Sequence, residues 1–169
     1  MPAEETPIRP ARAEDADAIA RIYRQGIEER AATFQTEAPR ADEIAAEIAA
    51  GRLMLVAETG GHVVGWASVG PYDDAHPYYA GVGEATLYVD RAARRGGAGR
   101  ALLGALANEA GRRGHHKLIG KIFTSNEPSI ALVKSCGWRQ VGIHHRHGRL
   151  DGEWRDVLVV ERLLGVQAG

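Results

Sequence analysis

The chain has 169 residues, of which 44% are hydrophobic and 25% charged, a composition typical of one globular domain with a substantial core. Its net charge of −1 excludes the strong positive field with which proteins attract nucleic acid or an anionic membrane. The single cysteine, Cys136, excludes an intramolecular disulfide, and the acidic N-terminus lacks the apolar run of a signal peptide. We therefore expect a cytoplasmic protein without a membrane or nucleic-acid partner.

Hydrophobic periodicity predicts a mixed α/β fold. In chain order, the first half is predicted to form a strand at 8–11, helices at 14–26 and 41–50, and a hairpin of strands at 53–57 and 63–69. Residues 71–83 are rich in Pro, Gly and polar side chains, which predicts an irregular loop. The second half is predicted to form a strand at 85–89, a helix at 101–113, a strand at 117–124, a helix at 128–135, and strands at 138–147 and 157–163.

These elements amount to about six or seven strands flanked by about four helices. They predict one domain over residues 8–164, preceded by a disordered N-terminus at 1–7 and followed by a tail at 165–169.

The segment from Arg94 to Arg100, Arg-Arg-Gly-Gly-Ala-Gly-Arg, lies between a predicted strand and a predicted helix. Glycines let backbone N–H groups come close to a ligand, and the helix directs its unpaired N–H groups and positive dipole end at the same point. The arginines add charge-assisted donors, so the segment predicts a phosphate-binding loop. It lacks the Gly-Lys ending of a P-loop, and Leu102 stands where a dinucleotide fingerprint has its third glycine. The alternative interpretation is a glycine-rich turn with solvated arginines.

The spacing Arg94-x-x-Gly97-x-Gly99 resembles the signature of the GCN5-related N-acetyltransferases, in which this loop holds the pyrophosphate of acetyl-CoA. Further segments follow the order found in one branch of that superfamily, the phosphinothricin and methionine sulfoximine acetyltransferases. They are Glu84-x-x-Leu87-Tyr88-Val89, Asn126-x-x-Ser129, Leu132-x-x-Ser135-x-Gly137-Trp138 and Gly152-x-Trp154-x-Asp156.

The resemblance implies an open mixed sheet whose central strands splay apart around acetyl-CoA as co-substrate, with no metal, in a homodimer. It implies cofactor contacts from the strand residues Leu87, Tyr88 and Val89 and from the loop residues Arg94, Arg95, Gly96, Gly97, Ala98, Gly99 and Arg100. Asn126 and Ser135 are implied on the pantetheine or phosphate side of the cofactor. From the sequence alone, Asn126 is equally well explained as the N-cap of the helix at 128–135.

Acetyl transfer to an amine requires a proton acceptor near the nitrogen and a donor for the charge on the thioester oxygen. We expect Glu84 to be that base, directly or through a water, with a pKa raised by partial burial. The alternative interpretation of Glu84 is a surface carboxylate at the start of a strand. By resemblance, the oxyanion donor is the Val89 N–H. Many superfamily members have a tyrosine at the position of Val133 to protonate the thiolate, so the general acid stays unassigned here.

The expected acceptor is the primary amine of a small molecule, an amino-acid analogue such as phosphinothricin or methionine sulfoximine, which attacks directly in a ternary complex. Its pocket is predicted to be lined by Phe34, Tyr72, His76, Tyr79, Glu84 and Trp154. The branch usually carries arginines in the loop before the glutamate, whereas residues 71–83 contain none and include Asp73 and Asp74. Arg30, Arg149 or Arg155 would have to supply the missing positive charge. Because of this difference in charge, an aminoglycoside, a polyamine or a protein N-terminus stays an alternative acceptor. A non-catalytic acyl-CoA-binding module is the alternative function.

Two further clusters have less specific interpretations. The histidines lack a matching set of carboxylate or cysteine ligands, so solvated side chains are favoured over a metal site for His115, His116, His144, His145 and His147. A second cluster is predicted to be a solvated basic patch or a contact for the 3′-phosphate of coenzyme A: Arg112, Arg113, Lys117 and Lys121.

Overall fold

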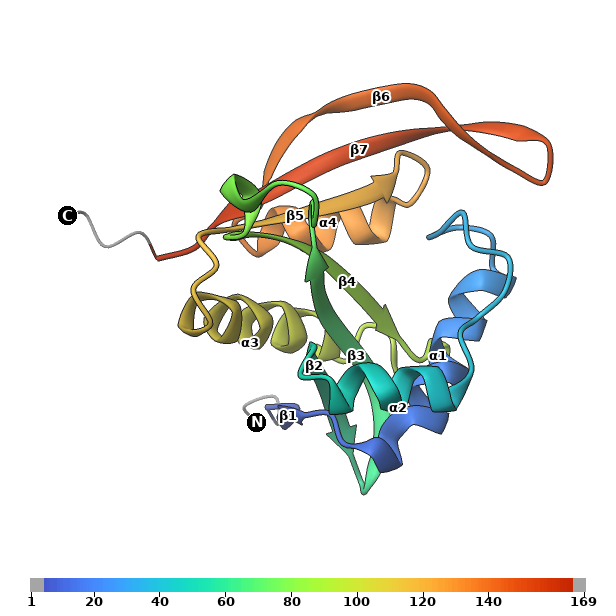
Figure 1. The fold of residues 1–169 in the computed structure, drawn as a ribbon. Coiled ribbons are helices and arrows are strands. Elements are labelled where there is room, and N and C mark those ends of the chain that lie inside the picture. The colour runs from blue at the N-terminus through green and yellow to red at the C-terminus, as the bar shows by residue number, and fades with distance from the viewer. Residues whose placement is uncertain (1–4, 166–169) are drawn as a thin grey trace.

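The computed structural model describes residues 5–165, which form a seven-stranded sheet in the order β1-β2-β3-β4-β5-β7-β6 (Figure 1). The strands are β1 (Ile8–Pro10), β2 (Leu53–Thr59), β3 (His62–Pro71), β4 (Val82–Val89), β5 (Lys117–Phe123), β6 (Arg139–Leu150) and β7 (Glu153–Leu163). The helices are α1 (Ala16–Glu28), α2 (Ala41–Ala49), α3 (Ala98–Arg112) and α4 (Glu127–Ser135). Neighbouring strands are antiparallel except β4 and β5, which run parallel.

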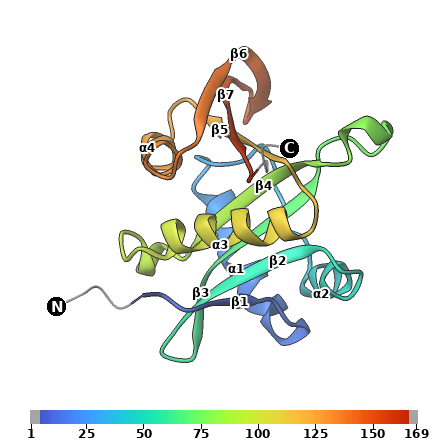
Figure 2. The ribbon, with the colours of Figure 1, turned by 90° about the vertical axis from the view of Figure 1, so that its left-hand side faces the viewer.

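Helices cover both faces of the sheet, because alternate residues of a strand point to opposite faces. In β2, Leu53 and Leu55 pack with α3, whereas Met54 and Val56 pack with α1 and α2. Figure 2 shows α3 crossing the sheet on the side toward the viewer. The residues predicted to face inward from α3 are all buried: Leu102, Leu103, Leu106 and Ala110. Burial of each such leucine or isoleucine side chain contributes about 1.5–3 kcal/mol to the free energy of unfolding, so these layers stabilise the sheet.

The sheet is continuous at one end of β4 and β5 and open at the other. The two strands pair only where Val82–Glu84 lie beside Lys117–Ile119. Beyond that point β4 stays paired with β3, and β5 stays paired with β7. The sheet therefore divides into two arms, which diverge in Figure 1 between β4 and β5. This confirms the mixed α/β fold with a splayed centre.

The predicted boundaries were wrong at two places. The third helix begins at Ala98 and not at 101, because Gly97 with φ +88° turns the chain directly into it. The last strand begins at Glu153 and not at 157, because Asp151 and Gly152, with φ of +51° and +81°, form a tight two-residue turn. Most of β6 is exposed, so apolar alternation does not mark its full length.

The predicted irregular loop at 71–83 also contains regular structure. Its ends belong to β3 and β4, and Pro77–Tyr79 form a single 3₁₀ turn. Proline favours this turn because its fixed φ is already that of a helix.

The termini are partly defined. Of the predicted N-terminal segment and tail, residues 1–4 and 166–169 lie outside the described residues. The Pro7 carbonyl accepts a hydrogen bond of 3.0 Å from the Glu58 N–H, which extends the pairing of the first two strands. Between residues 5 and 165, none of the helices has the length and apolarity that a membrane crossing requires.

Candidate active site

The space between the two arms of the sheet is a cavity of about 520 Å³, here called the gap cavity. Its walls come from β4, β5, α4, the β6–β7 hairpin, and α1 with its connection to α2. They include Glu84, Lys121, Leu132, Val133 and Phe34. A volume of this size is typical of a site for a small molecule or a cofactor.

Glu84 and Lys121 face each other where the sheet opens. Glu84 lies opposite Ile119 in the last register pair, so Lys121, two residues further along β5, presents its side chain on the same face. The Lys121 Nζ lies 3.4 Å from the Glu84 Oε2, and the two side chains are 48% and 34% exposed. The predicted base thus lies in the gap cavity beside a cation.

The edge of β4 presents backbone donors to this cavity. The Asp90 N–H donates to the Val64 carbonyl of β3 at 2.8 Å. Because backbone groups alternate along an antiparallel strand, those of Leu87 and Val89 point away from β3. They point to the side from which β5 has already diverged. An extended ligand can pair with such an edge as an added strand does.

The predicted phosphate loop leads from β4 into α3. Arg95 and Gly97, on either side of Gly96, have positive φ values of +66° and +88°. The first helical hydrogen bond joins the Ala101 N–H to the Gly97 carbonyl at 3.0 Å. The N–H groups of residues 98–100 precede that bond, and Gly97 has no side chain with which to cap them. The loop therefore has the geometry of an anion site at a helix N-terminus.

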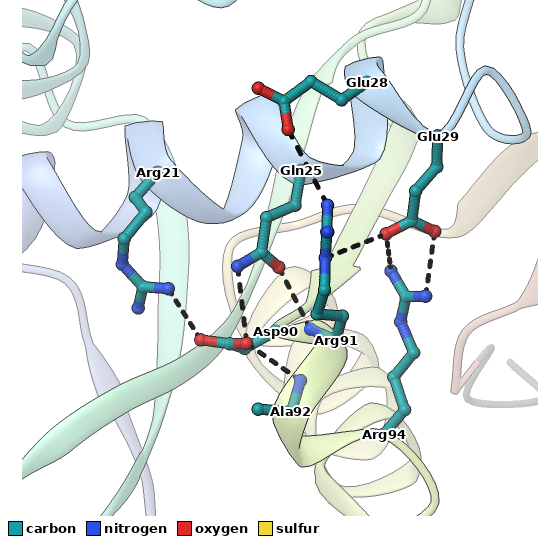
Figure 3. A network of polar contacts seen from close by, with 8 residues as sticks. All are labelled: Arg21, Gln25, Glu28, Glu29, Asp90, Arg91, Ala92 and Arg94. Atoms are coloured by element: carbon teal, nitrogen blue, oxygen red, sulfur yellow. Dashed lines mark hydrogen bonds and ion pairs between the residues drawn. The ribbon is translucent and has the colours of Figure 1, made fainter.

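The first arginine of the loop binds one of the chain's own carboxylates (Figure 3). Arg94 donates two hydrogen bonds of 2.8 Å to Glu29, and Arg91 approaches the same carboxylate at 3.6 Å. Next to them, Arg21 pairs with Asp90 at 2.7 Å. The guanidinium groups of Arg94 and Arg21 lower the pKa values of Glu29 and Asp90. This network connects the loop to α1. If Arg94 also contacts a phosphate, its guanidinium has to be shared between that phosphate and Glu29.

Ser135 and Asn126 make local hydrogen bonds around α4. The Ser135 Oγ donates to the Leu132 carbonyl at 2.7 Å and accepts from Arg100 at 2.9 Å. The Asn126 Oδ1 accepts from the Ser129 N–H at 3.4 Å, which confirms its interpretation as a helix N-cap. Asn126 also lines the gap cavity, whereas Ser135 reaches the phosphate loop through Arg100. Their contacts with a cofactor stay predictions.

The residues predicted to line the acceptor pocket are divided between separate places. Phe34 lines the gap cavity with Glu84, and its ring lies 4.8 Å from that of Phe123. Tyr72, His76 and Tyr79 instead line a second cavity of about 600 Å³, here called the loop cavity. The structure does not bring these three side chains together with Glu84.

Trp154 belongs to neither cavity lining. It is 51% exposed at the start of β7, and the guanidinium carbon of Arg149 lies 4.3 Å from its ring centroid.

The acidic charge of residues 71–83 also lies away from Glu84. Asp73 and Asp74 line the loop cavity, where Asp73 contacts His76 at 2.8 Å. The His76 ring lowers the pKa of the Asp73 carboxyl. Neither aspartate is among the residues that line the gap cavity with Glu84.

The four residues of the predicted basic cluster pair with different carboxylates. Arg112 and Arg113 both pair with Glu109, at 2.9 and 3.2 Å. Lys117 pairs with Glu161 at 2.8 Å, whereas Lys121 turns into the gap cavity.

The histidines of β6 make side-chain contacts of their own. His144 stacks on His147 at 4.3 Å, and His145 contacts Asp156 at 3.1 Å. Within the described chain, no three His, Cys, Asp or Glu side chains are arranged to hold a metal ion.

One wall of the gap cavity contains two phenol groups: that of Tyr88, an expected cofactor contact, and that of Tyr23, which the sequence interpretation did not assign to the site. The rings of Tyr23 and Tyr88 lie 4.9 Å apart, and both line the cavity beside Thr33. Burial raises the pKa of both tyrosines, so their hydroxyl groups stay protonated at neutral pH. Tyr23 belongs to α1, and the packing of α1 against β4 places its ring here.

Comparisons with known proteins agree with this geometry. The profile described as "Acetyltransferase (GNAT) family" matches residues 17–138. The phosphinothricin N-acetyltransferase of Streptomyces viridochromogenes is 32% identical over 155 residues, which cover 89% of this chain and 83% of the relative. The L-amino acid N-acyltransferase MnaT of Escherichia coli is 32% identical over 158 residues, which cover 91% of each chain.

A solved structure shows the same architecture. The structure of yncA from Salmonella typhimurium, determined with its cofactor acetyl-CoA, aligns with a TM-score of 0.90 at 30% identity. The alignment covers 97% of this chain and 96% of that one.

Proposed function

The chain belongs to the acetyltransferase (GNAT) family, and on that premise we propose that it transfers the acetyl group of acetyl-CoA to the primary amine of a small amino-acid-like molecule. The named relatives at 32% identity act on phosphinothricin and on L-amino acids, which supports an acceptor of this class. The single observation that carries the proposal is the free edge of β4, which runs along the gap cavity from Glu84 toward the glycine loop.

The residues present fit acetyl-CoA. Backbone groups of Leu87 and Val89 are available for hydrogen bonds to the amides of a pantetheine arm. The uncapped N–H groups at the start of α3 are available for a pyrophosphate. Gly99 leaves room for this approach, since a Cβ there would lie 3.0 Å from the Leu132 Cδ2.

When bound, acetyl-CoA supplies the acetyl group as a thioester that an amine nitrogen can attack. In our proposal the Glu84 carboxylate accepts the proton of the attacking amine, directly or through a water. The Val89 N–H donates to the thioester oxygen as negative charge develops on it. The products are the N-acetylated acceptor and the coenzyme A thiol. Val133 has no proton to give, so we assign no general acid to the departing sulfur.

We further propose a homodimer in the cytoplasm. β6 forms one edge of the sheet, and its side chains Val141 and Ile143 are 50% and 49% exposed. An edge strand with exposed apolar residues is suited to contact a second copy.

The direct test is release of free thiol when the protein is incubated with acetyl-CoA and a panel of amines. The panel contains L-phosphinothricin, L-methionine sulfoximine, a polyamine, an aminoglycoside and a short peptide. We expect thiol release with the two amino-acid analogues. Release with the polyamine, aminoglycoside or peptide alone would show that the acceptor class is wrong, and no release with any amine would favour a non-catalytic binding module.

A further inference from the structure

We infer that Lys121 binds the α-carboxylate of the acceptor, so that the acceptor is an α-amino acid whose carboxylate is free. The inference rests on the proposed function for the position of the amine at Glu84. It assigns a specificity-determining role to a side chain that the sequence interpretation placed in a solvated basic patch.

The first step is the arrangement of charge in the gap cavity. Glu84 and Lys121 stand on facing strands at the narrow end of the opening, 3.4 Å apart, and both side chains are partly exposed. Their separation exceeds the length of about 2.7–2.9 Å that is typical of a strong ammonium–carboxylate hydrogen bond. Each group therefore keeps hydrogen-bonding capacity for a ligand between the arms.

The second step is the match between this pair and an α-amino acid. Such a molecule carries its amine and its carboxylate on a single carbon. When the amine approaches Glu84, the carboxylate comes within reach of the neighbouring Lys121, and positive and negative groups alternate around the site. A simple amine lacks the second contact, and a polyamine would bring another cation toward Lys121.

The third step concerns the other arginine side chains that could hold a carboxylate in the gap cavity. Arg30 pairs with Asp151 at 3.1 Å, and Arg149 stacks on Trp154. The Arg155 guanidinium stands 5.7 Å from the ring centroid of Phe123 and does not line the cavity. Within residues 5–165, Lys121 is the only lysine or arginine among the residues that line the gap cavity.

The test compares ligands that differ only in the α-carboxylate. L-phosphinothricin and its decarboxylated analogue, 3-aminopropyl(methyl)phosphinate, are titrated calorimetrically into coenzyme A-saturated protein. L-methionine sulfone and 3-(methylsulfonyl)propylamine form a second pair. We expect wild-type protein to bind the carboxylate-bearing member of a pair at least about tenfold more tightly, as a charge-assisted contact predicts. Lys121→Met should reduce this ratio to about threefold or less, and Lys121→Arg should preserve most of it.

Lys117→Met is the matched control. Lys117 lies on the same strand and the same face, but it pairs with Glu161 outside the gap cavity. This variant should keep the wild-type ratio, and unchanged coenzyme A affinity shows that each variant is folded.

The possible outcomes separate this inference from the proposed function. A ratio that persists in Lys121→Met, or that is absent from the wild type for both pairs, would overturn the inference. Equal slowing of the acetylation of both members of a pair by Lys121→Met would show that Lys121 only positions Glu84, and it would also overturn the inference. Carboxylate-dependent binding without thiol release would leave the inference standing and contradict the proposed acetyl transfer.

Discussion

Glu84 is positioned by backbone pairing, which leaves its carboxylate available. It is the last residue of β4 that lies beside β5, so the pairing fixes its backbone while its side chain extends into the opening. The contact with Lys121 at 3.4 Å is longer than an ordinary charge-assisted hydrogen bond. A carboxylate held in this way keeps lone pairs for the proton of an incoming amine.

At the residue scale, we predict that Glu84→Gln lowers kcat by about 10²–10⁴-fold, the usual contribution of a positioned general base. The amide has nearly the same shape but cannot accept the proton as a carboxylate does. The acetyl-CoA dissociation constant should stay within about twofold of the wild type, because Glu84 is remote from the glycine loop. Steady-state kinetics and calorimetry measure the two quantities.

Glu109→Gln, which removes a partly exposed carboxylate of α3 that pairs with Arg112 and Arg113, is the control and should leave both constants unchanged. Turnover of Glu84→Gln close to that of the wild type would remove Glu84 from the role of base.

At the scale of elements, α3 and α4 approach each other closely at the end of the phosphate loop, where α3 begins. Gly99 permits this approach, and Leu132 of α4 both faces it and lines the gap cavity. The loop is also held on its other side, where Glu29 of the α1 end binds Arg94. The N-terminus of α3 is therefore fixed between two helices before any ligand arrives, which reduces the entropy cost of binding.

Gly99→Val is predicted to weaken acetyl-CoA binding by about tenfold or more, a loss of about 1.4 kcal/mol or more. The new side chain has to displace Leu132 or narrow the approach to the helix N–H groups. Gly104→Val, in the same helix, makes the same glycine-to-valine change in helix propensity and adds a Cβ that meets nothing within 4 Å. Calorimetry with both variants measures the difference, and equal affinities would contradict the assignment of this loop to the cofactor.

At the scale of the whole molecule, the sheet consists of two arms joined by a short parallel pairing. One arm, made of β1 to β4, packs against α1, α2 and α3, and the other, made of β5 and the long β6–β7 hairpin, packs against α4. The two arms are joined only where Val82–Glu84 of β4 pair with Lys117–Ile119 of β5. A ligand that pairs with the free edge of β4 and contacts α4 adds interactions between the arms.

Acetyl-CoA is therefore predicted to raise the melting temperature. A ligand at 100 times its dissociation constant stabilises the folded state by about 2.7 kcal/mol. For a chain of this size, that corresponds to roughly 5–10 °C. Differential scanning fluorimetry with increasing acetyl-CoA measures the shift, and Gly99→Val should lose most of it at the same concentration. An unchanged melting temperature at saturation would count against binding in the gap.

Much of this organisation could be predicted from particular residues. The helical spacing of Leu102, Leu106 and Ala110 identified α3 and its buried face. Asn126 before a proline identified the start of α4. The hairpin β6–β7 was predicted too short, because a strand exposed on both faces has no apolar alternation to mark its ends.

The candidate site was predicted less completely, since side chains far apart in the sequence meet there. Glu84 and Phe34 reach the same cavity, but Tyr72, His76 and Tyr79 lie at another one. Their position depends on the path of a loop whose conformation local pattern does not fix. Lys121 was predicted to belong to a solvated basic patch or a 3′-phosphate contact, because sequence spacing does not show which residue of β4 it faces.

The sequence by itself determined the fold class, the glycine loop between β4 and α3, and the family to which the chain is similar, since these depend on local periodicity and on an ordered set of short motifs. Only the tertiary structure decided where the sheet opens, which side chains share the gap cavity, and that Arg94 binds Glu29. The physical reason is that strand register and helix packing are long-range. A shift of one residue between β4 and β5 would turn Lys121 to the other face of the sheet. The local sequence of either strand does not determine that register.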